Sequence, residues 1–518
     1  MKIDKKQPLI FMLPLLGAVA VDEIQAYSQT TRPNIIIILA DDMGYGDVSA
    51  LNPAARTKTP AIDHMTKEGI VFTDAHASAS VSTPSRYGLL TGRYAFRSEK
   101  AAFGIWGFDR PVIEPGRETL ASMLKKMGYT TACIGKWHLG LGWQTKNKSE
   151  KVVQSKTTGF SNVDYRKKVT NGPNNHGFDY SFIHTASLDI PPYLFLRDHQ
   201  VIDPDVILTT DFYPSRRPYT RYAWDKKHTD SLDVYWEKGV WWRRGEMSRS
   251  FRIEDCHTTI LQEGLAFIER EAGKRGEKPF FLYLPLTGPH TPWVPAVSFR
   301  GKSSMGLYGD FIMDIDEAVR RIKEALVRHG IEKNTLLVFT SDNGAYWPSE
   351  EIALHHHDAN VGRRGQKGDI WEGGHRIPLV ITWPEYIRQP KRCNQPISLT
   401  DLFSTIGDLA GYSNINHSGE DSYSFLHILK GEVRSSVRPF MIHHSSNNFF
   451  AIRQGDWKYI DGLGSGGFTE PSVIQQASGD PAGQLYRLSI DSLETTNRYF
   501  EFPEKVKQMK KIMREHVK

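Results

Sequence analysis

Four apolar runs along the chain predict β-strands that are buried on both faces. The first, at residues 34–39, reads NIIIIL and is continuous and rich in β-branched side chains, as expected for a covered strand of a parallel sheet. Similar runs follow at residues 129–134, 280–284 and 336–340. Helical patterns alternate with them at residues 118–127, 255–271 and 314–329, the last ended by Gly330. The alternation predicts an α/β fold with a large, mostly parallel (mixed) sheet flanked by helices.

The pattern becomes looser after residue 384. Residues 399–410 still predict a helix of the main domain. Further along, residues 451–460 and 485–488 predict strands, the first of them part of a hairpin, and residues 501–516 predict a closing helix. We therefore expect an α/β domain over residues 29–420 and a smaller C-terminal α+β domain, built on a short antiparallel sheet, over residues 421–518. The polar stretch at residues 144–175 predicts a surface insertion.

The first 28 residues are typical of an export signal. Three lysines among the first six residues precede an apolar core at residues 8–21 that is too short to cross a bilayer as a helix, and Ala26-Tyr27-Ser28 resembles a cleavage site. No later segment is apolar enough to span a membrane, and the core holds no cysteine for a lipid anchor. We expect an exported protein, periplasmic or secreted, with no membrane anchor.

Composition excludes several classes. The 518 residues carry a formal net charge of +6, and the 65 Lys and Arg are scattered, so no nucleic-acid partner is expected. The three cysteines, Cys133, Cys256 and Cys393, are odd in number and lack paired spacing, which argues against a disulfide framework and against a zinc site.

Polar residues follow each of the four predicted core strands. They are Asp41 and Asp42 after the first, Lys136 and His138 after the second, His290 after the third, and Asp342 and Asn343 after the fourth. Open α/β sheets bind ligands at the carboxyl ends of their strands. Three carboxylates and an amide are hard oxygen ligands, suited to Ca²⁺ or Mg²⁺. A single Asp-Asp pair would also fit a helix cap or a turn.

A second cluster of signals begins at Ser82. Pro84 suits the first turn of a helix, which would place Ser82 at a helix N-terminus, where free N–H groups favour an anion. Arg86 follows one turn later. An ordinary helix start with an exposed arginine would also explain residues 82–86, which read STPSR.

The motif at residues 82–93, STPSRYGLLTGR, closely resembles the signature of the type I sulfatases, members of the alkaline-phosphatase-like superfamily. Three more stretches match that family in order, namely GKWHLG at 135–140, TGPHTP at 287–292 and KGDIWEGG at 367–374. The resemblance covers roughly residues 33–410. His375 stands where the family often has an aliphatic residue.

The resemblance implies a complete catalytic apparatus. Ser82 would be oxidised to formylglycine, whose hydrate attacks sulfur and forms a covalent sulfate–enzyme intermediate. Asp41, Asp42, Asp342, Asn343 and the modified Ser82 would bind Ca²⁺, with Mg²⁺ as the alternative. The remaining catalytic residues would be Arg86, Lys136 for sulfate binding, His138 as the base, and His290 with Lys367 at the leaving group. Because residue 82 is serine and not cysteine, maturation by a bacterial radical S-adenosylmethionine enzyme is implied.

An exported bacterial sulfatase would act on sulfated carbohydrates, and general likeness favours a galactose or N-acetylgalactosamine sulfate in a glycosaminoglycan or mucin-type glycan. Candidate substrate-binding residues are His176, Asp179, His184, Asp189, Arg197 and Arg363. Candidate sugar-stacking side chains are Trp106, Trp143, Tyr193, Trp241 and Trp242. Two alternatives stay open: a phosphatase or phosphodiesterase of the same superfamily, and a non-catalytic glycan-binding protein with unmodified Ser82.

Overall fold

The computed structural model describes residues 32–517, except 149–150, 214–233, 238, 275–277, 414–417, 433–435 and 437. The expected export signal at residues 1–28 therefore lies outside the described residues. No helix in the described part of the chain is long and apolar enough to cross a membrane.

A mixed sheet of ten strands forms the centre of the described structure, in the order β15-β2-β14-β13-β1-β12-β4-β5-β6-β7. The bounds are β15 Lys391–Cys393, β2 Ile70–Phe72, β14 Leu379–Thr382, β13 Thr335–Ser341, β1 Asn34–Asp41, β12 Phe280–Pro289, β4 Thr130–Lys136, β5 Tyr180–His184, β6 Phe195–Arg197 and β7 Gln200–Val201. The five strands from β13 to β5 are parallel, whereas β14 and β6 pair antiparallel with their neighbours. All four predicted core strands are present.

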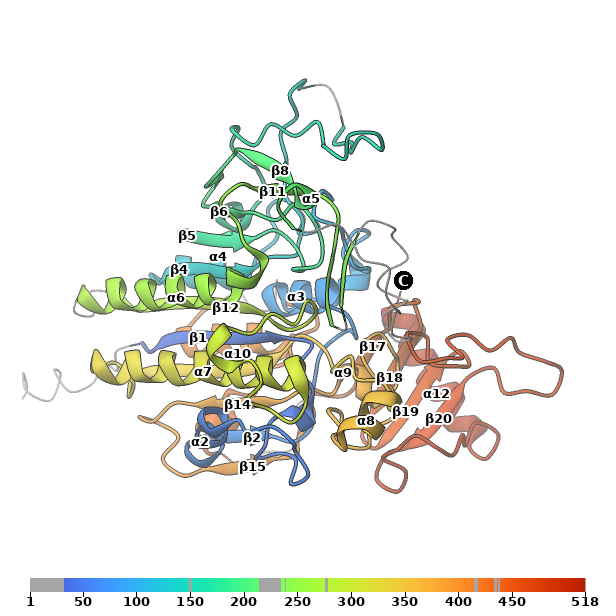
Figure 1. The fold of residues 1–518 in the computed structure, drawn as a ribbon. Helices are drawn as coiled ribbons and strands as arrows, with labels where there is room; N and C mark the ends of the chain where they lie inside the picture. The colour runs from blue at the N-terminus through green and yellow to red at the C-terminus, as the bar shows by residue number, and fades with distance from the viewer. Residues whose placement is uncertain are drawn as a thin grey trace, which may run out of the picture. The chain divides into compact units, whose positions relative to one another are not determined.

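Helices cover both faces of this sheet (Figure 1). Ile36 and Ile38 of β1 belong to a core shared with α2 (Pro60–Glu68), α6 (Cys256–Gly273) and α7 (Gly306–Arg328). Ile35 and Ile37 pack on the opposite face with α3 (Ser82–Thr91), α4 (Leu120–Lys126) and α10 (Asp401–Ala410). Both sets of alternating side chains of β1 are buried, which explains why its apolar run is continuous.

The smaller sheet lies in the C-terminal part of the chain (Figure 1). It contains β17 (Met441–His444), β18 (Phe450–Gln454), β19 (Trp457–Asp461) and β20 (Gln484–Arg487), all antiparallel. Residues 451–460 form most of the β18–β19 hairpin, which turns at Gly455 with φ +60°. Helix α12 (Pro503–His516) packs on β18 and β19. The predicted fold, a mixed sheet with helices and a short antiparallel C-terminal sheet, is confirmed.

Shorter elements connect these layers. They are β3 Ala75–His76, β8 Val206–Leu208, β9 Val234–Glu237, β10 Val240–Arg243, β11 Glu246–Ser248, β16 Ile397–Ser398, α5 Thr209–Phe212, α8 Ser349–His355, α9 Glu372–His375 and α11 Leu426–Leu429.

Helix α7 begins eight residues before its predicted start at residue 314. Gly306 and Gly309 lie in its first turn, and glycine lowers helix propensity by about 1 kcal/mol relative to alanine. Tyr308, Phe311 and Ile312 compensate, because all three are buried in the core. Tertiary packing thus extends the helix into a sequence that disfavours it locally.

Candidate active site

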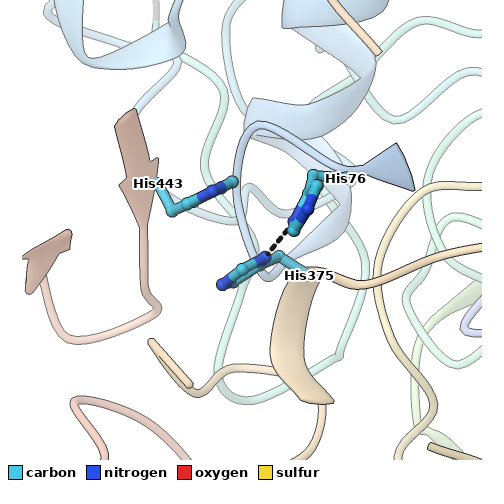
Figure 2. Close-up of side chains that lie close together, drawn as sticks. All are labelled: His76, His375 and His443. Atoms are coloured by element: carbon cyan, nitrogen blue, oxygen red, sulfur yellow. Dashed lines mark hydrogen bonds between the residues drawn. The ribbon is translucent and has the colours of Figure 1, made fainter. Parts of the chain in front are cut away.

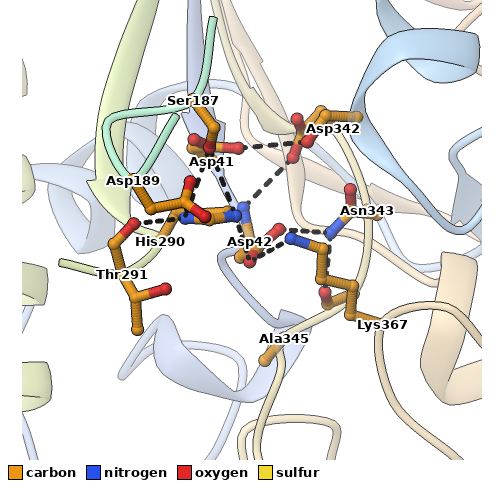
Figure 3. A network of polar contacts seen from close by, with 12 residues as sticks. Asp41, Asp42, Ser187, Asp189, His290, Thr291, Asp342, Asn343, Ala345 and Lys367 are labelled. Atoms are coloured by element: carbon orange, nitrogen blue, oxygen red, sulfur yellow. Dashed lines mark hydrogen bonds and ion pairs between the residues drawn. The ribbon is translucent and has the colours of Figure 1, made fainter. Parts of the chain in front are cut away.

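Three carboxylates meet where β1 and β13 end. Asp41 is the last residue of β1, Asp42 follows it with φ +65°, and Asp342 follows β13. One oxygen from each carboxylate lies within 4.8 Å of the others, and Figure 3 shows the group from close by. The Asp42 N–H donates to Asp342 Oδ1 at 3.1 Å. The parallel register of the strands therefore produces a concentrated negative charge at one edge of the sheet.

Ser82 and Arg86 reach this group from the first turns of α3. Ser82 is the first residue of the helix, and its Oγ lies 3.4 Å from Asp41 Oδ1. Arg86 is fully buried and donates to Asp342 Oδ2 from Nε at 3.0 Å and from Nη2 at 2.8 Å. Burial alone would lower the pKa of Arg86, but Asp342 and Asp41 raise it above its usual range. This guanidinium stays charged and fixes the two carboxylates.

Lys136, the last residue of β4, is fully buried at the same edge. Its Nζ lies 2.7 Å from Asp41 Oδ2, 3.4 Å from Ser82 Oγ and 3.1 Å from Ser187 Oγ. Burial lowers the pKa of Lys136, and Asp41 opposes that shift. The ammonium group is therefore placed beside the Ser82 oxygen.

His138 has φ +53° two residues beyond β4. Its Nε2 lies 2.9 Å from the carbonyl oxygen of Ile105, and because a carbonyl only accepts, Nε2 carries the proton. Among the described residues, the buried Nδ1 has no hydrogen-bond partner. Burial, and next Lys136, lowers the pKa of His138 well below its usual value. The ring is thus a neutral imidazole with a free lone pair on Nδ1, as a general base requires.

His290 and Lys367 approach Asp42. His290 follows β12 directly, and its backbone N–H donates to the backbone carbonyl of Asp41 at 2.9 Å. The Nδ1 lies 2.5 Å from the Thr291 carbonyl, and Nε2 lies 3.7 Å from Asp42 Oδ2 (Figure 3). Lys367 Nζ donates to Asp42 Oδ2 at 2.7 Å. Although burial would lower the pKa of Lys367, Asp42 raises it, so this lysine stays protonated.

Asn343 completes the oxygen cluster. Its Nδ2 donates to Asp42 Oδ1 at 2.7 Å and to the Gly344 carbonyl at 3.0 Å. Its Oδ1 is buried and has no hydrogen-bond partner among the described residues. A buried acceptor without a donor is costly, and three carboxylates beside it form a hard-oxygen set. The residues present therefore fit a divalent cation such as Ca²⁺ or Mg²⁺.

Two residues at this site were not identified from the sequence. Ser187 Oγ lies 3.1 Å from Lys136 Nζ and 3.3 Å from His290 Nε2. Arg243 forms an ion pair with Asp189, and Asp189 Oδ1 lies 4.0 Å from His290 Nδ1. Recognising the short segment YSFIH at residues 180–184 as a strand would have placed Ser187 and Asp189 at the same sheet edge.

The other substrate-binding candidates are distributed widely. His184 is paired with Lys136 across β4 and β5, is fully buried, and stacks on Phe251 with ring centroids 5.6 Å apart. Arg363 lies over the Tyr45 ring at 4.5 Å and lines a cavity of about 580 Å³ that also contains Gln366, the neighbour of Lys367.

Three candidates are not brought to the carboxylates. Asp179 Oδ2 accepts from the Thr131 N–H near the start of β4, roughly 16 Å along the strand from Lys136. Arg197 is paired with Phe182 in the middle of β5, and it contacts Glu263. His176 is buried beside Trp137, with ring centroids 6.4 Å apart.

Four of the five sugar-stacking candidates belong to the core. Trp143, Tyr193, Trp241 and Trp242 are buried, whereas Trp106 is 54% exposed. The Arg243 guanidinium lies over the Trp106 ring at 4.9 Å. Because Arg243 also binds Asp189, Trp106 stands beside the groups that surround His290.

A second buried group contains three imidazoles, those of His76, His375 and His443 (Figure 2). The Nδ1 atoms of His76 and His375 lie 3.0 Å apart, and the rings of His375 and His443 stack with centroids 3.8 Å apart. Lys458 Nζ lies 3.1 Å from His375 Nε2, and Asp74 Oδ1 lies 2.7 Å from His76 Nε2.

These contacts fix the protons of the imidazole group. Lys458 can only donate, so His375 Nε2 accepts and Nδ1 carries the proton. That proton is donated to His76 Nδ1, so a neutral His76 carries its proton on Nε2 and donates it to Asp74 at 2.7 Å. Arg453 Nη1 lies 3.1 Å from the same Nε2 and donates to Asp74 Oδ1 at 2.7 Å. Burial is the main cause that lowers the pKa of each ring, to about 4 for His76 and well below the usual value for His375 and His443.

Comparison with known proteins supplies independent evidence. The family model described as Sulfatase matches residues 33–412. The chain is 31% identical over 525 residues to an N-acetylgalactosamine-6-O-sulfatase of Bacteroides thetaiotaomicron, covering 97% of this chain and 98% of the relative. It is 28% identical over 558 residues to human arylsulfatase H, covering 94% and 92%.

A solved structure described with the metabolism of multiple glycosaminoglycans by Bacteroides thetaiotaomicron superimposes with a TM-score of 0.78 at 30% identity, covering 94% of this chain and 100% of the other. A solved sulfatase from Pseudoalteromonas shares the fold, with a TM-score of 0.68 at 23% identity and coverage of 96% and 93%.

Proposed function

Because the chain belongs to the sulfatase family and is a sulfuric ester hydrolase, we propose that its substrates are sulfated galactose or N-acetylgalactosamine units of glycosaminoglycan or mucin-type glycans, with the 6-O-sulfate as the preferred ester. The similarity to the N-acetylgalactosamine-6-O-sulfatase, which extends over 98% of that protein, carries this proposal. The relation to a structure described with glycosaminoglycan metabolism supports the same class of glycan.

The proposed nucleophile is a formylglycine derived from Ser82. Its support is the position of Ser82 Oγ, which lies 3.4 Å from both Asp41 Oδ1 and Lys136 Nζ. When formed, the hydrated aldehyde supplies the hydroxyl that attacks sulfur. The buried α3 N-terminus favours the negative charge of a sulfate at this point.

The surrounding side chains divide the remaining work. Lys136 holds sulfate charge beside residue 82, while Arg86 acts through the carboxylates, since its donors are used by Asp342, Asp41 and the Lys136 carbonyl. His138 takes a proton at Nδ1, its only free lone pair. Near Asp42, His290 and Lys367 are placed to stabilise the departing sugar oxygen.

A divalent cation, Ca²⁺ or Mg²⁺, is proposed at the oxygen cluster. Asp41, Asp42, Asp342, Asn343 through Oδ1 and the modified residue 82 would hold it, and it would neutralise sulfate charge and polarise the S–O bonds.

Two further proposals concern the cell. The sequence at residues 1–28 supports export, to the periplasm or the medium. The serine at position 82 supports maturation by a bacterial radical S-adenosylmethionine enzyme before the chain is active. Fractionation of the native host, with N-terminal sequencing of the exported protein, tests the first proposal: an intact N-terminus in the cytoplasm contradicts it.

The central experiment combines mass spectrometry with a substrate panel. The protein is co-expressed with a serine-type maturation enzyme, and the peptide containing residue 82 is expected to lose two hydrogens. The mature protein is then assayed on 6-sulfated and 4-sulfated N-acetylgalactosamine, 6-sulfated galactose and 6-sulfated N-acetylglucosamine, with Ser82→Ala as the inactive control. Preferred turnover of the N-acetylglucosamine ester would overturn the substrate proposal. Turnover by Ser82→Ala would overturn the nucleophile, and a native-host peptide without the modification would favour a glycan-binding role.

A further inference from the structure

The insertion at residues 144–175 has a local excess of positive charge. The insertion at residues 144–175 holds seven Lys or Arg and two acidic residues, whereas the whole chain has a net charge of only +6. The insertion therefore provides a local excess of positive charge that attracts anions.

The insertion borders a cavity of about 760 Å³, which we call the basic groove. Lys100, Arg110 and Lys151 line it and are exposed. None of the three forms an ion pair within the described part of the chain. Its one acidic lining residue, Asp109, already accepts the Trp106 N–H at 2.7 Å. The groove thus holds three cations whose charge is not neutralised by a neighbour.

The basic groove adjoins the active site. Ile105 lines the groove, and its carbonyl accepts the proton of His138 Nε2 at 2.9 Å. Leu141 and Gly142, which also line it, follow His138 by three and four residues. The groove is therefore on the His138 side of the catalytic site, where a chain of sugars attached to the reacting unit can meet it.

Two aromatic side chains are exposed close in sequence to Ile105, which lines the groove. Phe103 is 49% and Trp106 54% exposed, on either side of the buried Ile105. Exposed aromatic rings of this size offer apolar faces for sugar rings. Within the groove itself, Phe108 and Trp143 also form part of the lining.

The cavity on the Lys367 side has the opposite charge. It is lined by Arg363 but also by Glu350, Asp358 and Glu470. The three carboxylates would repel an anionic polymer, so we expect such a polymer to bind at the basic groove and not at this second cavity.

We propose that the basic groove binds the sulfated glycan chain beyond the sugar that reacts, through the sulfate or carboxylate groups of neighbouring units. The inference rests on the proposed function, since it takes the substrate to be part of an anionic polysaccharide. It makes the enzyme a binder of polymers, with Lys100, Arg110 and Lys151 determining affinity for the chain and the strand-end residues determining the chemistry.

Binding is tested separately from turnover. The protein as expressed, with unmodified Ser82, is titrated with size-fractionated chondroitin 6-sulfate by affinity electrophoresis at several salt concentrations. For the variant K100E/R110E/K151E we expect affinity to fall roughly tenfold or more and its dependence on salt to become shallower.

A matched control reverses two lysines and one arginine elsewhere. The variant K507E/K511E/R514E changes exposed residues of α12, a helix that packs on the C-terminal sheet and is distant in sequence from the groove residues. It should bind the polymer much as the wild type does. Equal losses in both variants would show a general charge effect and overturn the groove. Unchanged binding in K100E/R110E/K151E would overturn it as well.

Competition between two polymers shows whether the groove recognises sulfate or carboxylate groups. Hyaluronan carries carboxylates only, so competition by hyaluronan as strong as that by chondroitin sulfate assigns carboxylate recognition, and weaker competition assigns sulfate.

With the mature enzyme, the groove variant should raise KM for the polymer and leave kcat/KM for a sulfated monosaccharide unchanged. If the wild type hydrolyses no sulfated sugar but the binding difference persists, the proposed substrate fails and the groove stands.

Discussion

The structure contains two buried groups that look alike by proximity alone. One consists of Asp41, Asp42 and Asp342, and the other of His76, His375 and His443. In each group, three atoms that could ligate a metal lie within 4.8 Å of one another. They differ in how their lone pairs are used. At the carboxylates, Asn343 Oδ1 is an additional buried oxygen without a partner among the described residues. This is the arrangement expected where a cation binds.

The imidazole group is instead a largely satisfied network. Contacts with Lys458, Asp74 and the Ala77 carbonyl, and the contact between two rings, account for five of its six ring nitrogens. Only His443 Nε2 has no partner among the described residues. Ligation of a metal would require His375 Nδ1 to lose the proton that Lys458 imposes. The two groups therefore differ in the unpartnered atom and its surroundings, which are an amide oxygen among carboxylates in the first and an imidazole nitrogen of a hydrogen-bonded network in the second.

The two groups also connect different segments. The carboxylates follow strands of one sheet, so the register of that sheet places them. The histidines come from β3, α9 and β17, and thus join the main domain to the C-terminal sheet. We therefore expect changes in the first group to affect turnover and changes in the second to affect stability.

The largest expected effect is on turnover. Asp342→Asn keeps the shape of the side chain but removes the charge that faces Arg86, and we expect kcat/KM of the mature enzyme to fall about 1000-fold or more. The measurement is hydrolysis of the preferred sulfated sugar, with circular dichroism to verify folding. His443→Gln serves as the control from the other group and should retain turnover within about threefold. Comparable losses in the two variants would break the division.

Stability should respond in the opposite way. Lys458 is fully buried and neutralises Glu494 at 2.8 Å and Glu372 at 3.2 Å. Lys458→Met leaves both carboxylates without this partner, which should lower the free energy of unfolding by about 3–5 kcal/mol. Urea denaturation measures it. Turnover per folded molecule should be retained, and a stability change below about 1 kcal/mol would contradict the assigned role of the network.

The sequence predicted the positions of the four core strands because β-branched runs buried on both faces have a distinctive pattern. It also indicated which residues follow those strands, and the parallel register brings Asp41, Lys136, His290 and Asp342 together. The position of Ser82 was predicted by Pro84, since that proline lies in the first turn of α3.

Other features depend on packing that no local pattern contains. Asp179 precedes β5, so it lies at the opposite end of the sheet from the loop with Ser187. The burial of Trp241 and Tyr193 follows from elements distant in sequence, since an aromatic ring is equally suited to a core and to a sugar face. The partnership of His375 with β17 is likewise a consequence of how the C-terminal sheet packs.

A smaller effect concerns metal binding without catalysis. Ca²⁺ at about 100 times its Kd should stabilise the wild type by about 2.7 kcal/mol, seen as a rise in Tm. Asn343→Ala, which removes the unpartnered Oδ1, should diminish that rise. Zn²⁺ should produce no rise that depends on His443. A Zn²⁺-dependent rise that disappears in His443→Gln would show that the imidazole group binds metal and would remove the contrast.

The smallest expected effect is a pH dependence of stability from the imidazole group. The pKa of His76 is lowered to about 4, first by burial and next by Arg376, whereas an unfolded histidine titrates near 6.5. Between these values the unfolded chain binds a proton that the folded chain does not. Stability is therefore independent of this histidine above pH 6.5, decreases as the pH falls from 6.5 to 4, and levels off below 4; at pH 5.5 the loss is about 1 kcal/mol for each such ring.

His443→Gln isolates one ring of that dependence. Its amide does not titrate, and the change removes the one unpartnered imidazole nitrogen. Denaturation curves at pH 7.5 and 5.5 should show a difference between the two pH values that is about 1 kcal/mol smaller in the variant than in the wild type. Other buried histidines, such as His184, titrate alike in both proteins and cancel in this comparison. An identical pH dependence would mean that His443 keeps its ordinary pKa in the folded state, and the imidazole group would then not be the neutral network that distinguishes it from the carboxylates.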